Sequence, residues 1–175
     1  MAESINNYYI KPPTVDKSKI PHDFIIRHND PSSLKKAVEV IGGFYNRELS
    51  IDYITFASKY IEKNRVAYIW TEEAYQRRTQ EVKVVVIGVC LFEWKNYNKR
   101  PIEWELSWVW FHPNERGKGH LSRDWEKLKN LFPGFSVKGP LNAAMDNFLK
   151  KNDPEIKVVG PLRGEQSCRF SFEDK

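Results

Sequence analysis

One junction constrains the fold of this chain more than any other feature. Residues 105–111 (ELSWVWF) read as a strand, residues 116–122 (RGKGHLS) as a basic turn with two glycines, and apolar residues then recur at helical spacing up to Phe132. A strand that ends in such a turn gathers the unpaired N–H groups of a helix N-terminus, where the helix dipole favours negative charge. The junction therefore predicts a turn that can hold a phosphate.

The composition of the turn supports this interpretation. Gly117 and Gly119 let the backbone approach an anion closely, while Arg116 and Lys118 supply positive charge. The spacing fits neither the nucleotide-binding P-loop, which ends in Gly-Lys-Ser/Thr, nor the dinucleotide fingerprint with its three glycines. An exposed basic turn without a ligand remains the alternative.

The other segments predict an α+β domain with a mostly antiparallel sheet. A length of 175 residues suits one domain, and we divide the chain into an N-terminal arm (1–20), the domain (21–151) and a tail (152–175) with a candidate edge strand at CRFSF. The expected strands are an edge strand at 24–27, a strand at 66–70, an antiparallel pair at 82–94 and 102–111, and a strand at 135–138. A turn or exposed loop is expected at 71–80. The expected helices begin at Pro31 and at Ser50, and two more are expected at 121–132 and 140–151.

The composition limits which cellular environment and which binding partners we expect for this protein. The net charge of +5 is spread along the chain, which suits an anionic partner and ranks nucleic acid behind an anionic cofactor. The start of the chain lacks an export signal, and the longest apolar run, residues 84–92, is too short to span a bilayer, so we expect a cytoplasmic protein without membrane association. The histidines and the two cysteines show no ligand spacing, so we expect no metal site.

The order of strand, RGKG turn, amphipathic helix, short strand and helix resembles the acetyl-CoA-binding half of the GNAT-type N-acetyltransferase superfamily. Residues 116–119 match the first four positions of its signature, Arg/Gln-x-x-Gly-x-Gly/Ala, and the resemblance covers about residues 66–151. It implies a GNAT-like mixed sheet flanked by helices, with acetyl-CoA or another acyl-CoA as donor. The donor-binding residues that it implies are Val109, Trp110 and Phe111 on the strand, Arg116, Gly117, Lys118, Gly119, His120, Leu121 and Ser122 at the turn, and Asn142.

Two positions depart from the family pattern. Leu121 stands where the signature has Gly or Ala, which affects how the helix begins. In the last helix the family often has Asn followed seven residues later by a tyrosine that protonates the leaving thiolate. Asn142 fits the first of these positions, whereas Leu149 occupies the second and cannot donate a proton. If acyl transfer occurs, either another group or water serves as the acid, or the step proceeds without strong acid assistance.

Direct acyl transfer also needs a base for the amine. Alternation along the strand places Trp104, Leu106, Trp108 and Trp110 on one face, and the opposite face carries Glu103 and Glu105. Glu105 is our candidate base, directly or through water, with Glu103 as its alternate. Both could equally be solvated strand residues opposite cations, and a β-bulge would shift the alternation.

The sequence therefore predicts transfer of an acyl group from acyl-CoA to an amine whose identity it does not specify. One alternative is a catalytically impaired protein of the same fold that binds CoA or a protein partner. A nucleic-acid-binding module is the third hypothesis, and a homodimer is left open.

Overall fold

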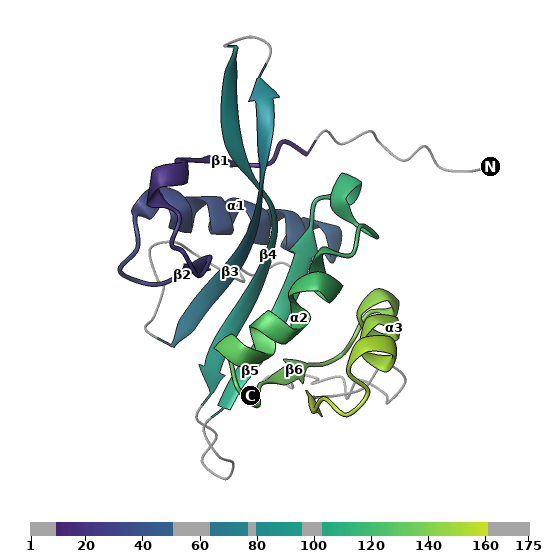
Figure 1. Ribbon diagram of the computed structural model, residues 1–175. Helices are drawn as coiled ribbons and strands as arrows, with labels where there is room; N and C mark the ends of the chain where they lie inside the picture. Colours follow the sequence, from purple (N-terminus) through teal and green to yellow (C-terminus); the bar gives the residue numbers. More distant parts are fainter. Residues whose placement is uncertain (1–9, 51–63, 77–79, 96–102, 161–175) are drawn as a thin grey trace, which may run out of the picture.

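The computed structural model describes residues 10–50, 64–76, 80–95 and 103–160. A twisted mixed sheet lies at its centre, in the order β2-β3-β4-β5-β6-β7, with β1 paired to β4 outside this row (Figure 1). The pairs from β1 to β5 are antiparallel, and β6 and β7 are added in parallel. The strands are β1 (Thr14–Val15), β2 (Ile25–Ile26), β3 (Arg65–Gln76), β4 (Glu81–Lys95), β5 (Glu103–Phe111), β6 (Ser136–Lys138) and β7 (Val158–Val159).

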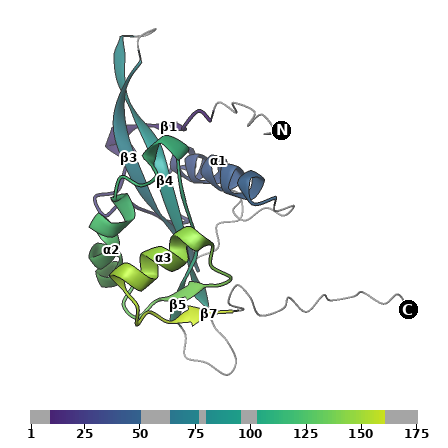
Figure 2. The same cartoon turned by 90° about the vertical axis from the view of Figure 1, so that its right-hand side faces the viewer.

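Helices cover both faces of this sheet. On one face, Val38 and Ile41 of α1 (Ser32–Glu48) pack against β-strand residues that include Trp108. On the other, α2 (His120–Leu131) and α3 (Ala143–Asn152) contribute Trp125, Leu128 and Leu149 to a second apolar cluster. Figures 1 and 2 show α1 on the opposite side of the strands from α2 and α3. None of the helices described here has the length and apolar character needed to span a bilayer.

A β-bulge interrupts β5. Leu91 pairs with Trp108 whereas the next residue, Phe92, pairs with Leu106, so Ser107 is the extra residue. Because one added residue reverses the alternation of side chains, Leu106 joins the cluster under α2 while Trp108 packs beneath α1. The prediction of one continuous face from Trp104 to Trp110 is therefore wrong.

Beyond the bulge, β5 and β6 separate. They pair only through Glu105 with Ser136 and Leu106 with Val137, and the chain then leaves β6 towards α3. In the described part of the chain, no strand pairs with this edge of β5 from Ser107 to Phe111. The separation opens the cleft that forms the site.

Several predicted boundaries change. The turn or loop predicted at 71–80 is wrong for its first six residues, because β3 continues to Gln76 in a long ribbon with β4 that projects beyond the sheet (Figure 1). The helix from Pro31 runs past Gly42 and Gly43 to Glu48, since Phe44 and Tyr45 pack on Trp110 and Trp108. The predicted helix from Ser50 and the predicted strand at CRFSF lie outside the described residues, although β7 does add an edge strand after residue 152.

Candidate functional site

Two cavities meet where β5 and β6 separate. The turn cavity, of about 490 Å³, extends from the β5 edge to the RGKG turn. The Arg65 cavity, of about 630 Å³, extends the other way, to Arg65, Glu93 and Lys95 on β3 and β4. The cavities form one continuous cleft, because both are lined by Tyr45, Leu49, Val109, Asn142 and Met145.

The turn has the backbone that its sequence predicts. Gly117 and Gly119 adopt left-handed φ angles of 75° and 78°, and no atom lies within 4 Å of the position that a Cβ would take at either residue. Gly119 is the N-cap of α2, and as a glycine it has no side chain with which to cap the helix. The N–H groups of the first helical turn therefore remain available beside the cavity, which is lined by Gly119, His120, Leu121 and Ser122.

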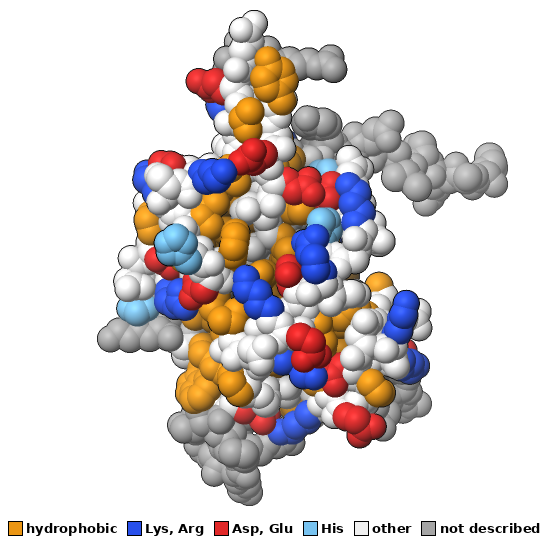
Figure 3. Space-filling view, in the orientation of Figure 1, with side chains coloured by type: hydrophobic (Ala, Val, Ile, Leu, Met, Phe, Trp, Pro, Cys, Tyr) orange, Lys and Arg blue, Asp and Glu red, His pale blue; other side chains and the backbone are white. Residues whose placement is uncertain are grey.

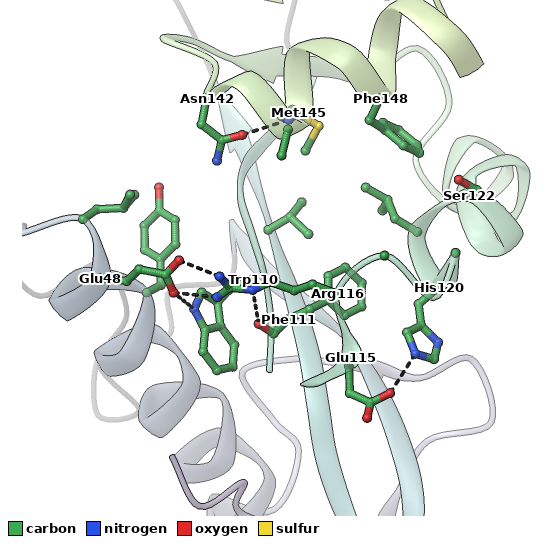
Figure 4. A pocket seen from close by; sticks show the side chains of 17 residues that line it. Glu48, Trp110, Phe111, Glu115, Arg116, His120, Ser122, Asn142, Met145 and Phe148 are labelled. Atoms are coloured by element: carbon green, nitrogen blue, oxygen red, sulfur yellow. Dashed lines mark hydrogen bonds and ion pairs between the residues drawn. The ribbon is translucent and has the colours of Figure 1, made fainter. Parts of the chain in front are cut away.

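The two cations of the turn are already paired. Both terminal nitrogens of Arg116 donate to the Glu48 carboxylate, at 2.8 and 2.6 Å, and Arg116 Nε donates to the carbonyl of Phe111 at 3.0 Å (Figure 4). Lys118 Nζ lies 2.8 Å from Glu115 Oε1. An anion at this turn would therefore meet chiefly backbone amides rather than unpaired cations.

Glu48 is held at the wall of the cavity by two groups. Besides Arg116, the indole Nε1 of Trp110 donates to its carboxylate at 2.8 Å. The hydrogen bond from Arg116 lowers the pKa of Glu48 most strongly and, with Trp110, outweighs the opposing effect of partial burial. The carboxylate is therefore charged at neutral pH, and it ties the end of α1 to the turn.

His120 opens α2 beneath the β5 edge. Its ring stacks on Phe111 with 5.8 Å between ring centroids, and its Nε2 lies 3.1 Å from Glu115 Oε2. Glu72, Glu115 and His120 bring one potential ligand atom each to within 4.8 Å of one another. Lys118 Nζ and His120 Nε2 each contact one oxygen of the Glu115 carboxylate.

The start of α3 forms the opposite wall of the cleft. Asn142 caps this helix by accepting a hydrogen bond from the Met145 N–H at 2.8 Å, and Met145 and Phe148 line the turn cavity (Figure 4). Leu149 is 4% exposed and belongs to the core under α2 and α3. The position of the family tyrosine thus faces the core of this protein rather than the cleft.

Neither predicted base lines the cleft. Glu105 is 2% exposed and lies before the bulge, where β5 is paired on both sides, opposite Glu93 on β4 and Ser136 on β6. Glu103 binds Lys157 Nζ through both carboxylate oxygens, at 2.8 and 2.9 Å. All the predicted donor-binding residues except Lys118 line the turn cavity, and the two glutamates lie outside both cavity linings.

Sequence reasoning missed two groups in the cleft. Tyr45, near the end of α1, lines both cavities and stacks on Trp108 with ring centroids 5.0 Å apart. Glu93, buried in the Arg65 cavity, directly follows the apolar run VVVIGVCLF, which was a detectable signal. Burial raises the pKa of Glu93, but Lys95 and Arg65 outweigh this effect, and the net pKa is lowered.

Comparison with known proteins supports this fold. No protein-family model matches the chain, and no curated protein matches its sequence. Among solved structures, the acetyltransferase domain of xEco2, determined bound to a CoA conjugate, is similar over 79% of this chain and 92% of that domain, with a TM-score of 0.54 and 13% identity. This chain has an acetyltransferase-like fold. The expected α+β class, with its mixed, mostly antiparallel sheet flanked by helices, is confirmed, while the low identity limits the likeness to the fold.

Proposed function

We propose that this protein transfers an acyl group from acyl-CoA, with acetyl-CoA as the first donor to test, directly to an amine. The observation that carries the proposal is the turn cavity, in which two left-handed glycines and an uncapped helix N-terminus meet an unpaired strand edge. Such a helix end suits a pyrophosphate, and a strand edge suits an amide-containing arm such as pantetheine.

The donor would be held along the turn cavity. The amides of His120, Leu121 and Ser122 would bind the pyrophosphate, and Val109 to Phe111 would pair with the pantetheine arm. The open space at Gly117 and Gly119 fits close approach of such an anion. Met145 and Phe148 supply an apolar wall opposite the strand. The donor provides the thioester, and the chain orients it toward the residues shared with the Arg65 cavity.

The acceptor would enter through the Arg65 cavity, because this cavity reaches the same shared residues from the other side. Tyr45 of α1 lines both cavities, whereas none of the described residues of the segment 71–80 lines either one. In the transfer, the amine nitrogen forms a C–N bond with the thioester carbonyl carbon as the C–S bond breaks. The nitrogen loses one proton, and the sulfur gains one.

Tyr45 is our assignment for the proton donor to sulfur. Of the five residues that line both cavities, only Tyr45 carries a hydroxyl, and Asn142 adds an amide that can donate a hydrogen bond. Tyr45 thus takes the role that Leu149, in the core, cannot perform. Since Glu105 and Glu103 lie outside the cleft linings, we assign removal of the amine proton to water in the Arg65 cavity.

A CoA-binding protein without transferase activity is the second candidate, favoured by the burial of Leu149 and the pairing of Arg116 with Glu48. Nucleic-acid binding is less favoured, because Lys and Arg side chains are interspersed with Asp and Glu over the described part of the face in Figure 3. Release of free CoA thiol with a panel of amines, together with the mass of the acylated product, tests transfer directly. CoA binding without amine-dependent release would favour the second candidate.

A further inference from the structure

The Arg65 cavity has a charge that the turn cavity lacks. Arg65, Lys95 and Lys138 line it together with a single carboxylate, that of Glu93, which leaves an excess of two positive charges. The turn cavity, by contrast, is lined by two carboxylates, Glu48 and Glu115, and by one arginine. We infer that the acceptor carries a carboxylate or another anionic group besides its amine, and that the Arg65 cavity binds this group. The inference rests on the proposed acyl transfer.

A buried carboxylate fixes two of these cations in place. Glu93 is 6% exposed and lies directly across the β3–β4 ladder from Arg65. Arg65 Nε is 2.9 Å from one oxygen of Glu93, and Lys95 Nζ contacts the other oxygen. Ordering by such a partner reduces the entropy that these long side chains would lose on binding a ligand. The positive end of the cavity is therefore preorganised.

The arginine retains donors for a ligand. Its Nε lies 2.9 Å from Glu93 Oε1, and the guanidinium carries two further terminal nitrogens that can donate hydrogen bonds. The Arg65 side chain is 34% exposed and lines the cavity. Terminal guanidinium nitrogens match the two oxygens of a carboxylate or phosphate. Lys138, which is exposed and makes no ion pair with any described residue, adds a second charge to this site.

The positions of the two ends of the cavity define an elongated acceptor. Val109, where the cavities meet, lies opposite Cys90 on β4, and Arg65 lies opposite Glu93, three residues farther along β4. This separation is about 10 Å along the strands, and because β3 and β5 flank β4, two strand spacings add roughly another 10 Å across the sheet. An amine near Val109 and an anion near Arg65 therefore fit a molecule in which several bonds separate the two groups. An ω-amino acid, or a lysine side chain beside an acidic residue, has this arrangement.

Binding and turnover of three six-carbon amines test the inference. The probes are 6-aminohexanoate, hexylamine, which has no charged group at its far end, and 1,6-diaminohexane, which has a second amine there. Each is titrated into the protein in the presence of free CoA and then assayed as an acceptor with saturating acetyl-CoA. We expect 6-aminohexanoate to bind best. Arg65→Gln should weaken its binding and raise its KM about tenfold, as loss of a charge-assisted hydrogen bond would, and should leave hexylamine within twofold. A lysine peptide with acidic neighbours separates a free small acceptor from a peptide acceptor.

Two variants accompany Arg65→Gln. Lys138→Gln removes a cavity charge without disturbing Glu93 and should weaken 6-aminohexanoate severalfold. Lys150→Gln, which changes an exposed lysine of α3 outside the cavity, should have no effect. Binding of 6-aminohexanoate that depends on Arg65, without any turnover, would contradict the acyl-transfer proposal while supporting the present inference. Equal or better binding of hexylamine or the diamine, or binding of none of the probes, would overturn it.

Discussion

Arg116 and Glu48 form a two-pronged ion pair, with contacts of 2.8 and 2.6 Å, that joins the turn before α2 to the last residue of α1. Arg116 is the first residue of the signature that resembles a CoA-binding turn, and this pair commits its terminal nitrogens within the protein. Its carboxylate partner lines the cavity in which we place the donor. The pair therefore balances charge at the proposed phosphate site, where the backbone amides would supply most of the contacts to a phosphate.

This balance predicts opposite effects from the two partners. Arg116→Gln should weaken acetyl-CoA binding about tenfold, because the negative charge of Glu48 beside the phosphates would no longer be balanced by a cation. Glu48→Gln should strengthen binding severalfold, because it releases Arg116. Calorimetric titration measures both, and the double variant should lie between them. Weaker binding in Glu48→Gln would show that the pair instead preorganises the site.

Tyr45→Phe tests the proposed acid. Removing the hydroxyl should lower kcat about 100-fold, within the range for general acid catalysis, and change acetyl-CoA affinity less than twofold. Tyr68→Phe is the matched control, since the Tyr68 hydroxyl accepts from Lys127 at 3.1 Å and lies outside both cavity linings. Steady-state kinetics across pH make the comparison. An unchanged kcat in Tyr45→Phe would assign proton donation to water.

Glu105→Gln should leave acyl transfer within about twofold of the original rate, since the carboxylate lies outside the cleft and general-base catalysis contributes far more than this. Rates are compared after thermal unfolding has shown that the variant is folded. A large fall in kcat with unchanged donor affinity would restore Glu105 as the base.

Acid should destabilise the fold partly through Glu93. Its pKa is lowered in the folded protein from the ordinary value of 4.5. The ion pairs of Glu93 therefore contribute fully above that value, and the contribution is lost as pH falls through the lowered folded pKa. Glu93→Gln should reduce the free energy of unfolding at pH 7 by roughly 1–3 kcal/mol and should make stability less dependent on pH below 4.5. Urea unfolding at pH 7 and at lower pH measures both effects. An unchanged pH dependence would mean that Glu93 is not charged in the folded protein.

The sequence was sufficient to predict the features that depend only on neighbouring residues. The RGKG turn, its two glycines and the helix after it depend on neighbouring residues, and the structure has each of them, with α2 at His120–Leu131 against a predicted 121–132. The predicted hairpin of residues 82–94 and 102–111 is likewise present as β4 and β5.

The sequence was insufficient to predict the features that depend on strand register or on the packing of a helix against the sheet. The bulge at Ser107 results from the pairing of β5 with β4, and the residue types in this segment do not predict it. The contact of Arg65 with Glu93 requires the register of two strands, and the place of Tyr45 requires the packing of α1 on Trp108. These features decide which carboxylate and which hydroxyl line the cleft, so the proposed catalytic groups could not be found from alternation along one strand.

The central claim is that the turn before α2 binds acyl-CoA through its backbone. The most direct test is calorimetric titration of acetyl-CoA into the original protein, Gly119→Glu and Gly134→Glu. Both glycines have left-handed φ angles, 78° and 69°, and open space at the Cβ position, but only Gly119 lines the cleft. We predict micromolar binding that is lost in Gly119→Glu and kept in Gly134→Glu. Binding that persists in a folded Gly119→Glu, or no binding to the original protein, would contradict the account.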